Sequence, residues 1–211
     1  MVNWDEHDRL RGHIKARMGE KRYRHTLGVE SEADKLAGIF GCGPELAKKI
    51  KSAALLHDIS KELGRREQLG ICGKYKIKLS KNDMRVGDSL HGRTGAYIAR
   101  HEFGACDEIF NAVYCHTFGA DYNKSGLLCK IICLADYIEP NRSRQDNLDA
   151  REYFYENLEG AEELGDKYIA LDKAMLFLLN QTLLRLVRED LFIHKDTIKN
   201  RNSFVLGLKN D

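Results

Sequence analysis

Two neighbouring residues, His57 and Asp58, end an apolar segment that reads AALLHD. A carboxylate drawn into a helical core is costly unless a cation compensates its charge, so neither residue is expected there for packing alone. Imidazole nitrogens and carboxylate oxygens are both good ligands for divalent metal ions. The pair therefore predicts one part of a metal site, whose other ligands must come from other segments.

Helical spacing identifies those other segments. Counting back from His57 in steps of three and four reaches Ala54, Ala53 and Ile50, which places the histidine on the apolar face of its own helix. The same count places three further histidines and one further aspartate on the apolar faces of their segments. The full set of candidate ligands is His25, His57, Asp58, His91, His116 and Asp136.

Each candidate ligand also has a simpler interpretation. A single histidine on an apolar face is more often a hydrogen-bonded core residue than a ligand, and an aspartate near a helix end is often a cap or a surface charge. Six such residues in one interior favour a metal site, because a core would have to satisfy all of them with one another. Helix bundles build such sites from inward side chains on facing helices.

The number of ligands suggests two metal ions. Six ligands are too many for one tetrahedral ion, and Asp58 is the natural bridge between two ions, each with about three or four protein ligands and open positions for water and substrate. Two ions about 4 Å apart activate water and stabilise the oxygens of a phosphoryl group. The residues alone therefore predict hydrolysis of a phosphoester or a phosphoanhydride, rather than metal storage or a structural site.

A phosphate substrate needs cations beyond the metal ions. Lys61 follows the His57-Asp58 pair by one helical turn, and we expect it at the mouth of the cavity as a catalytic and substrate-binding residue beside Asp58. Arg93, shortly after His91, and Arg142, shortly after Asp136, are further candidates for substrate binding. The alternative interpretation of each is an ordinary surface cation.

The elements that must position these residues are helices. Apolar residues recur at helical spacing through most of the chain, and only two prolines occur, which predicts an all-α protein of about ten helices. The expected helices cover residues 5–19, 22–40, 44–58, 62–70, 89–102, 106–117, 126–138, 147–164 and 167–191. The segment 74–81 alternates lysines with apolar residues, but we expect an extended connection there, because it has no partner strand. Residues 197–208 are too mixed to assign.

Composition restricts the class of partner. The sequence has 34 basic and 32 acidic residues, and the resulting formal charge of +2 gives no reason to expect binding to nucleic acid or to a membrane. The charged amino terminus is unlike a secretory signal, and no apolar run is long enough to span a bilayer. Six cysteines occur without a Cys-x-x-Cys pair, so we expect reduced cysteines in a cytoplasmic protein.

Some residues with chemical potential have a simpler expected role. Cys129 and Cys133 share the helix face of Asp136 and are close enough to approach a metal ion, but small buried side chains are the favoured interpretation. The four remaining histidines lie in charged or polar stretches, and we expect them to face solvent. They are His7, His13, His101 and His194.

Five segments resemble motifs of the HD-domain superfamily of metal-dependent phosphohydrolases, and most closely those of the bacterial YqeK family. They read RYRHTLGV at 22–29, LLHDISK at 55–61, SLHGRTGA at 89–96, HTFG at 116–119 and KIICLADYIEPNR at 130–142. The resemblance extends over nearly the whole chain. It implies one HD-type helical domain over residues 1–211, with the motifs in a core of about 20–142 and C-terminal helices over 147–208 packed on that core.

The resemblance also implies a reaction and a cofactor. YqeK proteins are symmetrical bis(5′-nucleosyl)-tetraphosphatases with two iron ions, which split diadenosine tetraphosphate into two ADP by a di-metal-activated hydroxide. By this resemblance, one ion is bound by His25, His57, Asp58 and Asp136, and the other by Asp58, His91 and His116. Manganese or another divalent ion remains an alternative to iron. Thr117 joins Lys61, Arg93 and Arg142 as an expected substrate contact.

Two departures from the family pattern bear on the substrate. Phe118 stands where the family usually has a threonine, and residues 72–88 match poorly, so the nucleoside-binding wall is undefined. The alternatives are therefore another nucleotidase, a cyclic-nucleotide phosphodiesterase, or a nucleotide-binding regulator without turnover. The expected partner is a dinucleoside polyphosphate or another nucleotide, and a homodimer stays open.

Overall fold

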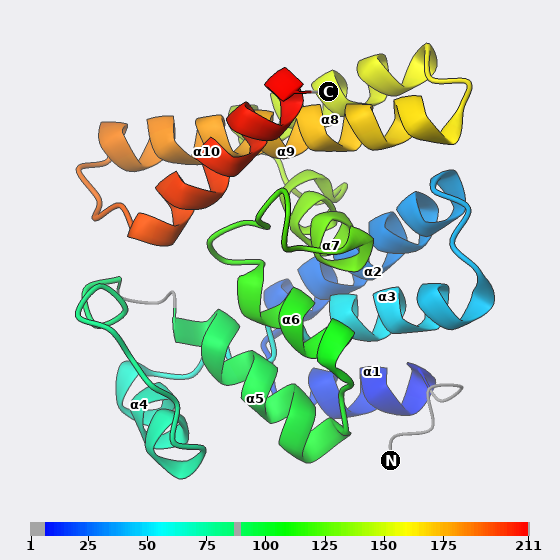
Figure 1. The fold of residues 1–211 in the computed structure, drawn as a ribbon. Helices are drawn as coiled ribbons and strands as arrows, with labels where there is room; N and C mark the ends of the chain where they lie inside the picture. The colour runs from blue at the N-terminus through cyan, green and yellow to red at the C-terminus, as the bar shows by residue number, and fades with distance from the viewer. Residues whose placement is uncertain (1–6, 87–89, 211) are drawn as a thin grey trace.

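The computed structural model describes residues 7–86 and 90–210 (Figure 1), and within these ranges the chain forms ten helices and no strand. The prediction of an all-α protein is therefore confirmed. The helices are α1 (His7–Lys15), α2 (Glu20–Ile39), α3 (Pro44–Leu56), α4 (Arg65–Lys74), α5 (His91–Phe103), α6 (Asp107–Cys115), α7 (Leu127–Ile138), α8 (Gln145–Glu159), α9 (Leu164–Arg188) and α10 (Lys195–Asn210).

Several helix ends differ from the expected ones: α1 ends at Lys15, α8 covers Gln145–Glu159 and α9 covers Leu164–Arg188. Two further differences concern α4 and α10. The short helix expected over 62–70 runs from Arg65 to Lys74, and it begins there because Gly64 is its N-cap, whose backbone N–H donates to Oε2 of Glu67 at 2.8 Å. The unassigned stretch 197–208 lies inside α10, a helix of 16 residues. Of the lysine-rich connection expected over 74–81, Lys74 is the last residue of α4, whereas residues 77–80 form no regular element, as expected. Positions 5, 6 and 89 of the expected helices lie outside the described residues.

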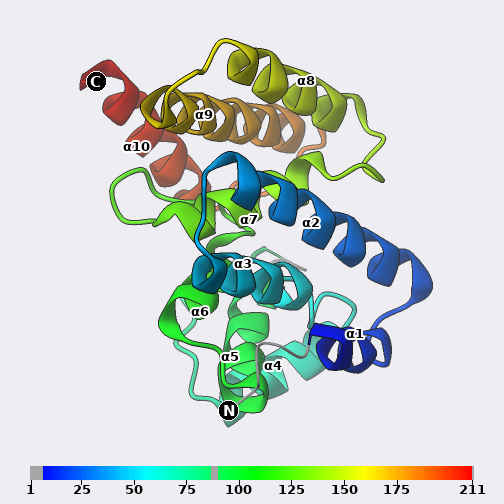
Figure 2. The same cartoon turned by 90° about the vertical axis from the view of Figure 1, so that its right-hand side faces the viewer.

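The helices lie in three levels. Figures 1 and 2 show α8, α9 and α10 together at one end of the molecule, α1, α4 and α5 towards the other end, and α2, α3 and α7 between them. Helix α7 packs against α2, α3, α6, α8 and α9. Its sequence, LLCKIICLADYI, is apolar on nearly every side, which is typical of a helix surrounded by others. The central helix therefore carries Asp136 into the interior.

The turn after α6 depends on one glycine. Gly119 has φ of +85°, a conformation that favours glycine, and a Cβ atom there would lie 2.6 Å from Cδ2 of Leu179 on α9. Through this close approach, the segment after His116 packs against α9. The same approach places α9 beside the histidines of the core. None of the described helices combines the length and apolarity that a bilayer crossing requires.

Candidate metal centre

The structure brings all six candidate ligands to one interior. His25 lies on α2 and Asp136 near the end of α7, whereas His57 and His116 are the C-cap residues of α3 and α6. His91 is the first residue of α5, and Asp58 follows His57 in a turn. The ligands are far apart in sequence, but the helices that carry them bring them together in the interior. All six are buried except Asp136, which is half-buried.

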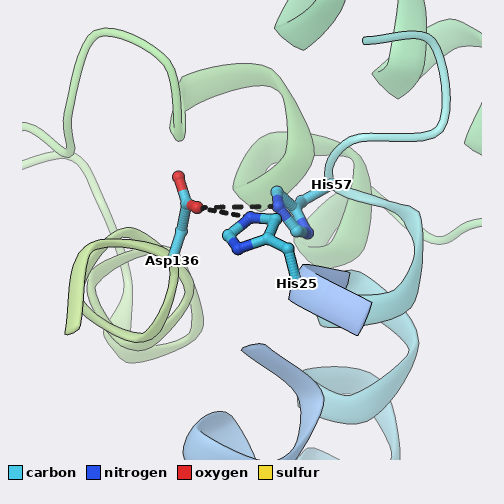
Figure 3. A group of neighbouring side chains, drawn as sticks. All are labelled: His25, His57 and Asp136. Carbon is cyan, nitrogen blue, oxygen red and sulfur yellow. Dashed lines mark ion pairs between the residues drawn. The ribbon is translucent and has the colours of Figure 1, made fainter. Parts of the chain in front are cut away.

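The first group consists of His25, His57 and Asp136, whose ligand atoms all lie within 4.8 Å of one another. Nε2 of His25 lies 3.0 Å from Oδ1 of Asp136, and Nε2 of His57 lies 3.8 Å from the same oxygen. Figure 3 shows both imidazole rings beside this carboxylate, with the two ion pairs dashed. Two nitrogens and one oxygen thus surround one point in the core.

The second group consists of Asp58, His91 and His116. Oδ1 of Asp58 lies 3.3 Å from Nε2 of His91 and 3.5 Å from Nε2 of His116. The two Nε2 atoms lie 3.1 Å apart, so both rings present this nitrogen to the same point. These three side chains can surround a second cation.

Asp58 lies between the two groups and presents one oxygen to each. Whereas Oδ1 faces His91 and His116, Oδ2 lies 3.4 Å from Nε2 of His57 and 3.7 Å from Nε2 of His25. A carboxylate that divides its oxygens between two sets of imidazoles has the arrangement of a bridging ligand.

Hydrogen bonds hold two of the imidazoles in the orientation that a metal ion needs. Nδ1 of His57 lies 2.6 Å from the carbonyl oxygen of Ala54, and Nδ1 of His116 lies 2.7 Å from that of Val113. Since a carbonyl oxygen can only accept, each Nδ1 carries the proton and each Nε2 keeps its lone pair. Nε2 of His57 is buried without a hydrogen-bond partner among the described residues. A metal ion would satisfy it, so this donor set fits a divalent cation.

Glu139 is a residue of the site that the ligand search missed. Its side chain is 1% exposed, and its Oε1 lies 3.0 Å from Nδ1 of His25. Its other oxygen, Oε2, accepts hydrogen bonds from the backbone N–H and the side-chain amide of Asn141 at 2.7 and 2.9 Å. The carboxylate therefore fixes the His25 ring from behind. The signal in the sequence was an acidic residue one helical turn after Asp136.

The surroundings of the two carboxyl groups favour their ionised form. Burial opposes ionisation of Asp58, but the neighbouring His57 and His116 outweigh it and hold the pKa of this carboxyl well below its usual range. For Asp136 burial is likewise outweighed, here mainly by Arg142, whose Nη2 lies 2.6 Å from Oδ1. Nη1 of Arg22 lies 2.6 Å from Oδ2 of Asp58. The interior thus holds two negative charges that attract cations.

The carboxylates around His25 also favour a positive charge on its ring. Burial lowers the pKa of its imidazole, but hydrogen bonds with Asp136 and Glu139 have the larger combined effect and raise it.

A cavity of about 350 Å³ opens beside these groups. Three of the predicted substrate contacts line it, namely Lys61, Thr117 and Arg142. Nζ of Lys61 lies 3.2 Å from Nε2 of His91, and burial lowers the pKa of this lysine against the opposing effect of Asp58. Sequence reasoning missed three further cations of the lining, which come from α2, the turn before α8, and α9. They are Arg22, Arg144 and Arg185.

Arg93 is not brought to this cavity. It is buried, its Nη2 lies 2.6 Å from Oδ1 of Asp83, and its guanidinium lies 4.8 Å from the ring centroid of Tyr114. It points from α5 towards the segment 80–86 instead of towards the metal-ligand groups. The arginine two residues after His91 thus connects α5 to a loop.

The prediction that His194 faces solvent is wrong. The residue is 2% exposed, because the connection after α9 folds back and stacks the His194 ring on Phe118 at 4.1 Å between centroids. Phe118, the departure from the family pattern, therefore has a packing partner. His7 is half-buried, with Nε2 3.1 Å from Oγ of Ser52, so it also differs from the expectation. His13 and His101 are exposed, as predicted.

The cysteines are all free, and none belongs to either ligand group. Cys129 and Cys133 are buried on α7, where the thiol of Cys115 interacts with both. Cys133 also lines the cavity. The three thiols therefore pack together where α6 meets α7.

Comparisons with known proteins identify similar sequences over nearly the whole chain. A model of the HD domain matches residues 22–141, which contain all six candidate ligands. A protein of Halalkalibacterium halodurans named symmetrical bis(5′-nucleosyl)-tetraphosphatase is 33% identical over 93% of this chain and 95% of its own length. A protein of Bacillus subtilis with the same name is 30% identical over 92% of this chain and 95% of its own length.

A solved structure is similar over the whole fold. The crystal structure of a predicted HD superfamily hydrolase involved in NAD metabolism, from Clostridium acetobutylicum, has a TM-score of 0.81 and 31% sequence identity. The match covers 96% of this chain and 98% of that one. The C-terminal helices, which lie beyond the matched HD residues, are therefore part of the shared fold.

Proposed function

This chain belongs to the HD domain family, and we propose that it is a metal-dependent symmetrical bis(5′-nucleosyl)-tetraphosphatase, which converts diadenosine tetraphosphate and water into two ADP. The observation that carries the proposal is the position of Asp58, which presents one carboxylate oxygen to each of two histidine groups. Together with relatives of that name over nearly the full length, this arrangement supports a hydrolase of the acid anhydride class.

We propose that one metal ion is held by His25, His57, Asp58 and Asp136, and the second by Asp58, His91 and His116. When bound, two divalent ions supply Lewis acidity for the activation of water and for the stabilisation of phosphoryl oxygens. Iron is the proposed metal, with manganese as the alternative, since imidazole and carboxylate donors suit both ions.

The chain's own residues would bind and orient the tetraphosphate. Arg22 and Arg142 already lie at the two carboxylates, so their guanidinium groups border the place where the phosphates would lie. Lys61 and Thr117 approach His91 from the cavity side, with Oγ1 of Thr117 3.3 Å from Nε2 of His91. We assign these four side chains to the central phosphates, where N–H and O–H groups can donate to phosphate oxygens.

The charge of the cavity favours a polyphosphate over the alternative substrates. Its lining includes five basic side chains, Arg22, Lys61, Arg142, Arg144 and Arg185. A nucleoside monophosphate or a cyclic nucleotide has a single phosphate and would contact few of these cations. A tetraphosphate can contact cations along the length of the cavity. The nucleotidase and phosphodiesterase alternatives are therefore less well supported.

Product analysis tests the proposed function. Protein loaded with Fe²⁺ or Mn²⁺ is incubated with diadenosine tetraphosphate, the nucleotides are separated by ion-exchange chromatography, and the metal content of the same sample is measured. We expect ADP as the sole product, about two metal ions per chain, and no turnover after treatment with a chelator. Formation of ATP with AMP, or no turnover by fully loaded protein, would contradict the proposal.

Three further properties are part of the proposal. The free cysteines support a cytoplasmic location, where thiols stay reduced. The formal charge of +2 supports a protein without a nucleic-acid partner. A homodimer would join exposed apolar side chains of α9 and α10, such as Val187 and Leu206, and light scattering at several concentrations tests this association.

A further inference from the structure

The loop between α6 and α7 packs along one face of α10, and Figures 1 and 2 show the two side by side. Asn200, Ser203 and Gly207 stand three and four residues apart, so they share this face. Oγ of Ser203 accepts a hydrogen bond from the backbone N–H of Tyr122 at 2.9 Å. Gly207 makes room for the ring of Tyr122, because a Cβ atom there would lie 2.4 Å from Cε1. The loop that follows His116 is therefore held by a helix that lies beyond the matched HD residues.

Asn200 holds the first turn of this loop. The residue is 9% exposed, and its side-chain amide donates to the carbonyl oxygen of Phe118 at 3.2 Å and to that of Gly119 at 2.8 Å. The amide has two N–H donors, so it can serve both carbonyl groups. His194, directly before α10, stacks on the ring of Phe118 in the same turn. The start of α10 thus fixes both the backbone and the aromatic ring of this turn.

The turn directs two side chains at the second ligand group. Nε2 of His116 lies 3.5 Å from Oδ1 of Asp58, and Oγ1 of Thr117 lies 3.3 Å from Nε2 of His91. Thr117 also packs closely on α5, because a Cβ atom at Gly92 would lie 2.5 Å from Oγ1. The two residues that follow Thr117 are those whose carbonyl groups accept from α10. A shift of this backbone would therefore move both the threonine hydroxyl and the neighbouring imidazole.

We propose that Asn200 is a positioning residue of the metal centre, whose two hydrogen bonds keep His116 and Thr117 directed at the second ligand group. The inference rests on the proposed function, because it concerns the residues assigned to the second ion and to the central phosphates. Asn200 does not line the cavity, so it acts through the turn and not by contact with the substrate. A displacement of about 1 Å at reacting groups can lower a rate about 100-fold, so a remote side chain that fixes a turn can control catalysis.

The test uses Asn200→Asp, with Asn202→Asp as the matched control. Aspartate keeps the shape of the side chain at position 200 but replaces the donating amide group with an oxygen, which repels the two carbonyl groups. Asn202 lies on the same helix, is exposed and does not line the cavity. Asn200→Ala removes the donor without adding an acceptor, and it serves as the second variant if the aspartate prevents folding. Circular dichroism checks the fold of each variant.

Three measurements follow the turn, the metal ions and the reaction. Hydrogen–deuterium exchange of the metal-free protein, measured by mass spectrometry, should be about tenfold faster in peptides that cover 116–119, because hydrogen bonds that restrain the turn are lost. Calorimetry should show about tenfold weaker Mn²⁺ binding. In steady-state kinetics with diadenosine tetraphosphate, kcat should fall about tenfold or more, with a smaller change in KM, since the other cations of the cavity still bind the phosphates. Asn202→Asp should match the wild type in all three.

The outcomes separate this inference from a purely structural role and from the proposed function. A side chain that serves only stability would lower the melting temperature and leave the Mn²⁺ affinity and the kcat of the folded protein unchanged. If the folded Asn200 variants match Asn202→Asp in the exchange of 116–119 or in Mn²⁺ affinity, the inference is wrong. If both quantities change but the wild type does not hydrolyse diadenosine tetraphosphate, the positioning role stands and the proposed reaction fails.

Discussion

Glu139 holds the His25 ring from the side opposite Asp136, with Oε1 of Glu139 3.0 Å from Nδ1 of His25. Gly28, one turn after His25 on α2, makes room for this carboxylate, because a Cβ atom at position 28 would lie 2.2 Å from Oε2. Gly28 and Glu139 thus both help to fix the orientation of the His25 ring. In metal sites, a carboxylate on the far side of a histidine orients the ring and increases its basicity.

Replacement of Glu139 by glutamine is expected to weaken metal binding about 10- to 100-fold, the usual effect of losing such a partner. The amide oxygen of glutamine still accepts from Nδ1 of His25, so the fold should persist while the negative charge behind the ring is lost. Calorimetric titration with Mn²⁺ measures the affinity. Glu152→Gln on the exposed face of α8 is the control and should bind as the wild type does. Equal affinity of the Glu139 and Glu152 variants would contradict the orienting role.

Gly28→Ala tests the same contact from the other side. The added methyl group would overlap the Glu139 carboxylate, so we expect a loss of roughly 1–3 kcal/mol in the free energy of unfolding together with weaker metal binding. Gly38→Ala on the same helix is the matched control, because a Cβ atom there has no neighbour within 4 Å. Removal of a helical glycine should stabilise that variant by about 0.5–1 kcal/mol. Urea unfolding of both variants checks the opposite signs, and equal signs would refute this explanation of Gly28.

Asp58→Asn and Asp136→Asn should differ in metal stoichiometry. Asp58 faces both histidine groups, whereas Asp136 faces only His25 and His57. We therefore expect Asp58→Asn to lose both ions and Asp136→Asn to lose chiefly one of them, measured by mass spectrometry of the metal content after dialysis. Product analysis should show no hydrolysis by Asp58→Asn. Two retained ions in Asp58→Asn would remove this residue from the bridging role.

The ligands could be predicted from sequence because helical periodicity is a local property. His57 and Asp136 stand at fixed steps from apolar residues of their own helices, and that spacing alone predicts an inward direction. Contacts between distant segments have no such signal. The stacking of His194 on Phe118 depends on how the chain returns after α9, so a polar context suggested solvent. Arg144 and Arg185 reach the cavity only because α8 and α9 pack beside α7. A local pattern of charges does not predict that packing.

The ion pair between Asp83 and Arg93 gives a prediction about pH. Burial disfavours the charged form of Asp83, but hydrogen bonds from Ser80 and the nearby Arg93 lower the pKa of its carboxyl. His194 and Asp196 also face this pair, at 3.3 Å from Asp83 and 3.7 Å from Arg93 respectively. Since the pKa is lower in the folded chain, the stabilisation is complete above the unfolded-state value of about 3.9 and is lost as the pH falls through the folded-state value.

Asp83→Asn should therefore destabilise the protein at pH 7, by roughly 3 kcal/mol, because Arg93 keeps a buried charge without its closest partner. The difference in free energy of unfolding between wild type and variant should shrink as the pH is lowered from about 4 towards the folded-state pKa of Asp83, because the carboxyl takes up a proton first in the unfolded chain. Urea unfolding at a series of pH values measures this difference. Asp34→Asn is the control, since its ion pair with Lys51 is exposed and should contribute less than about 1 kcal/mol. If the difference in free energy of unfolding for Asp83→Asn stays constant down to pH 3, Asp83 stabilises the protein through its packing and not through its charge.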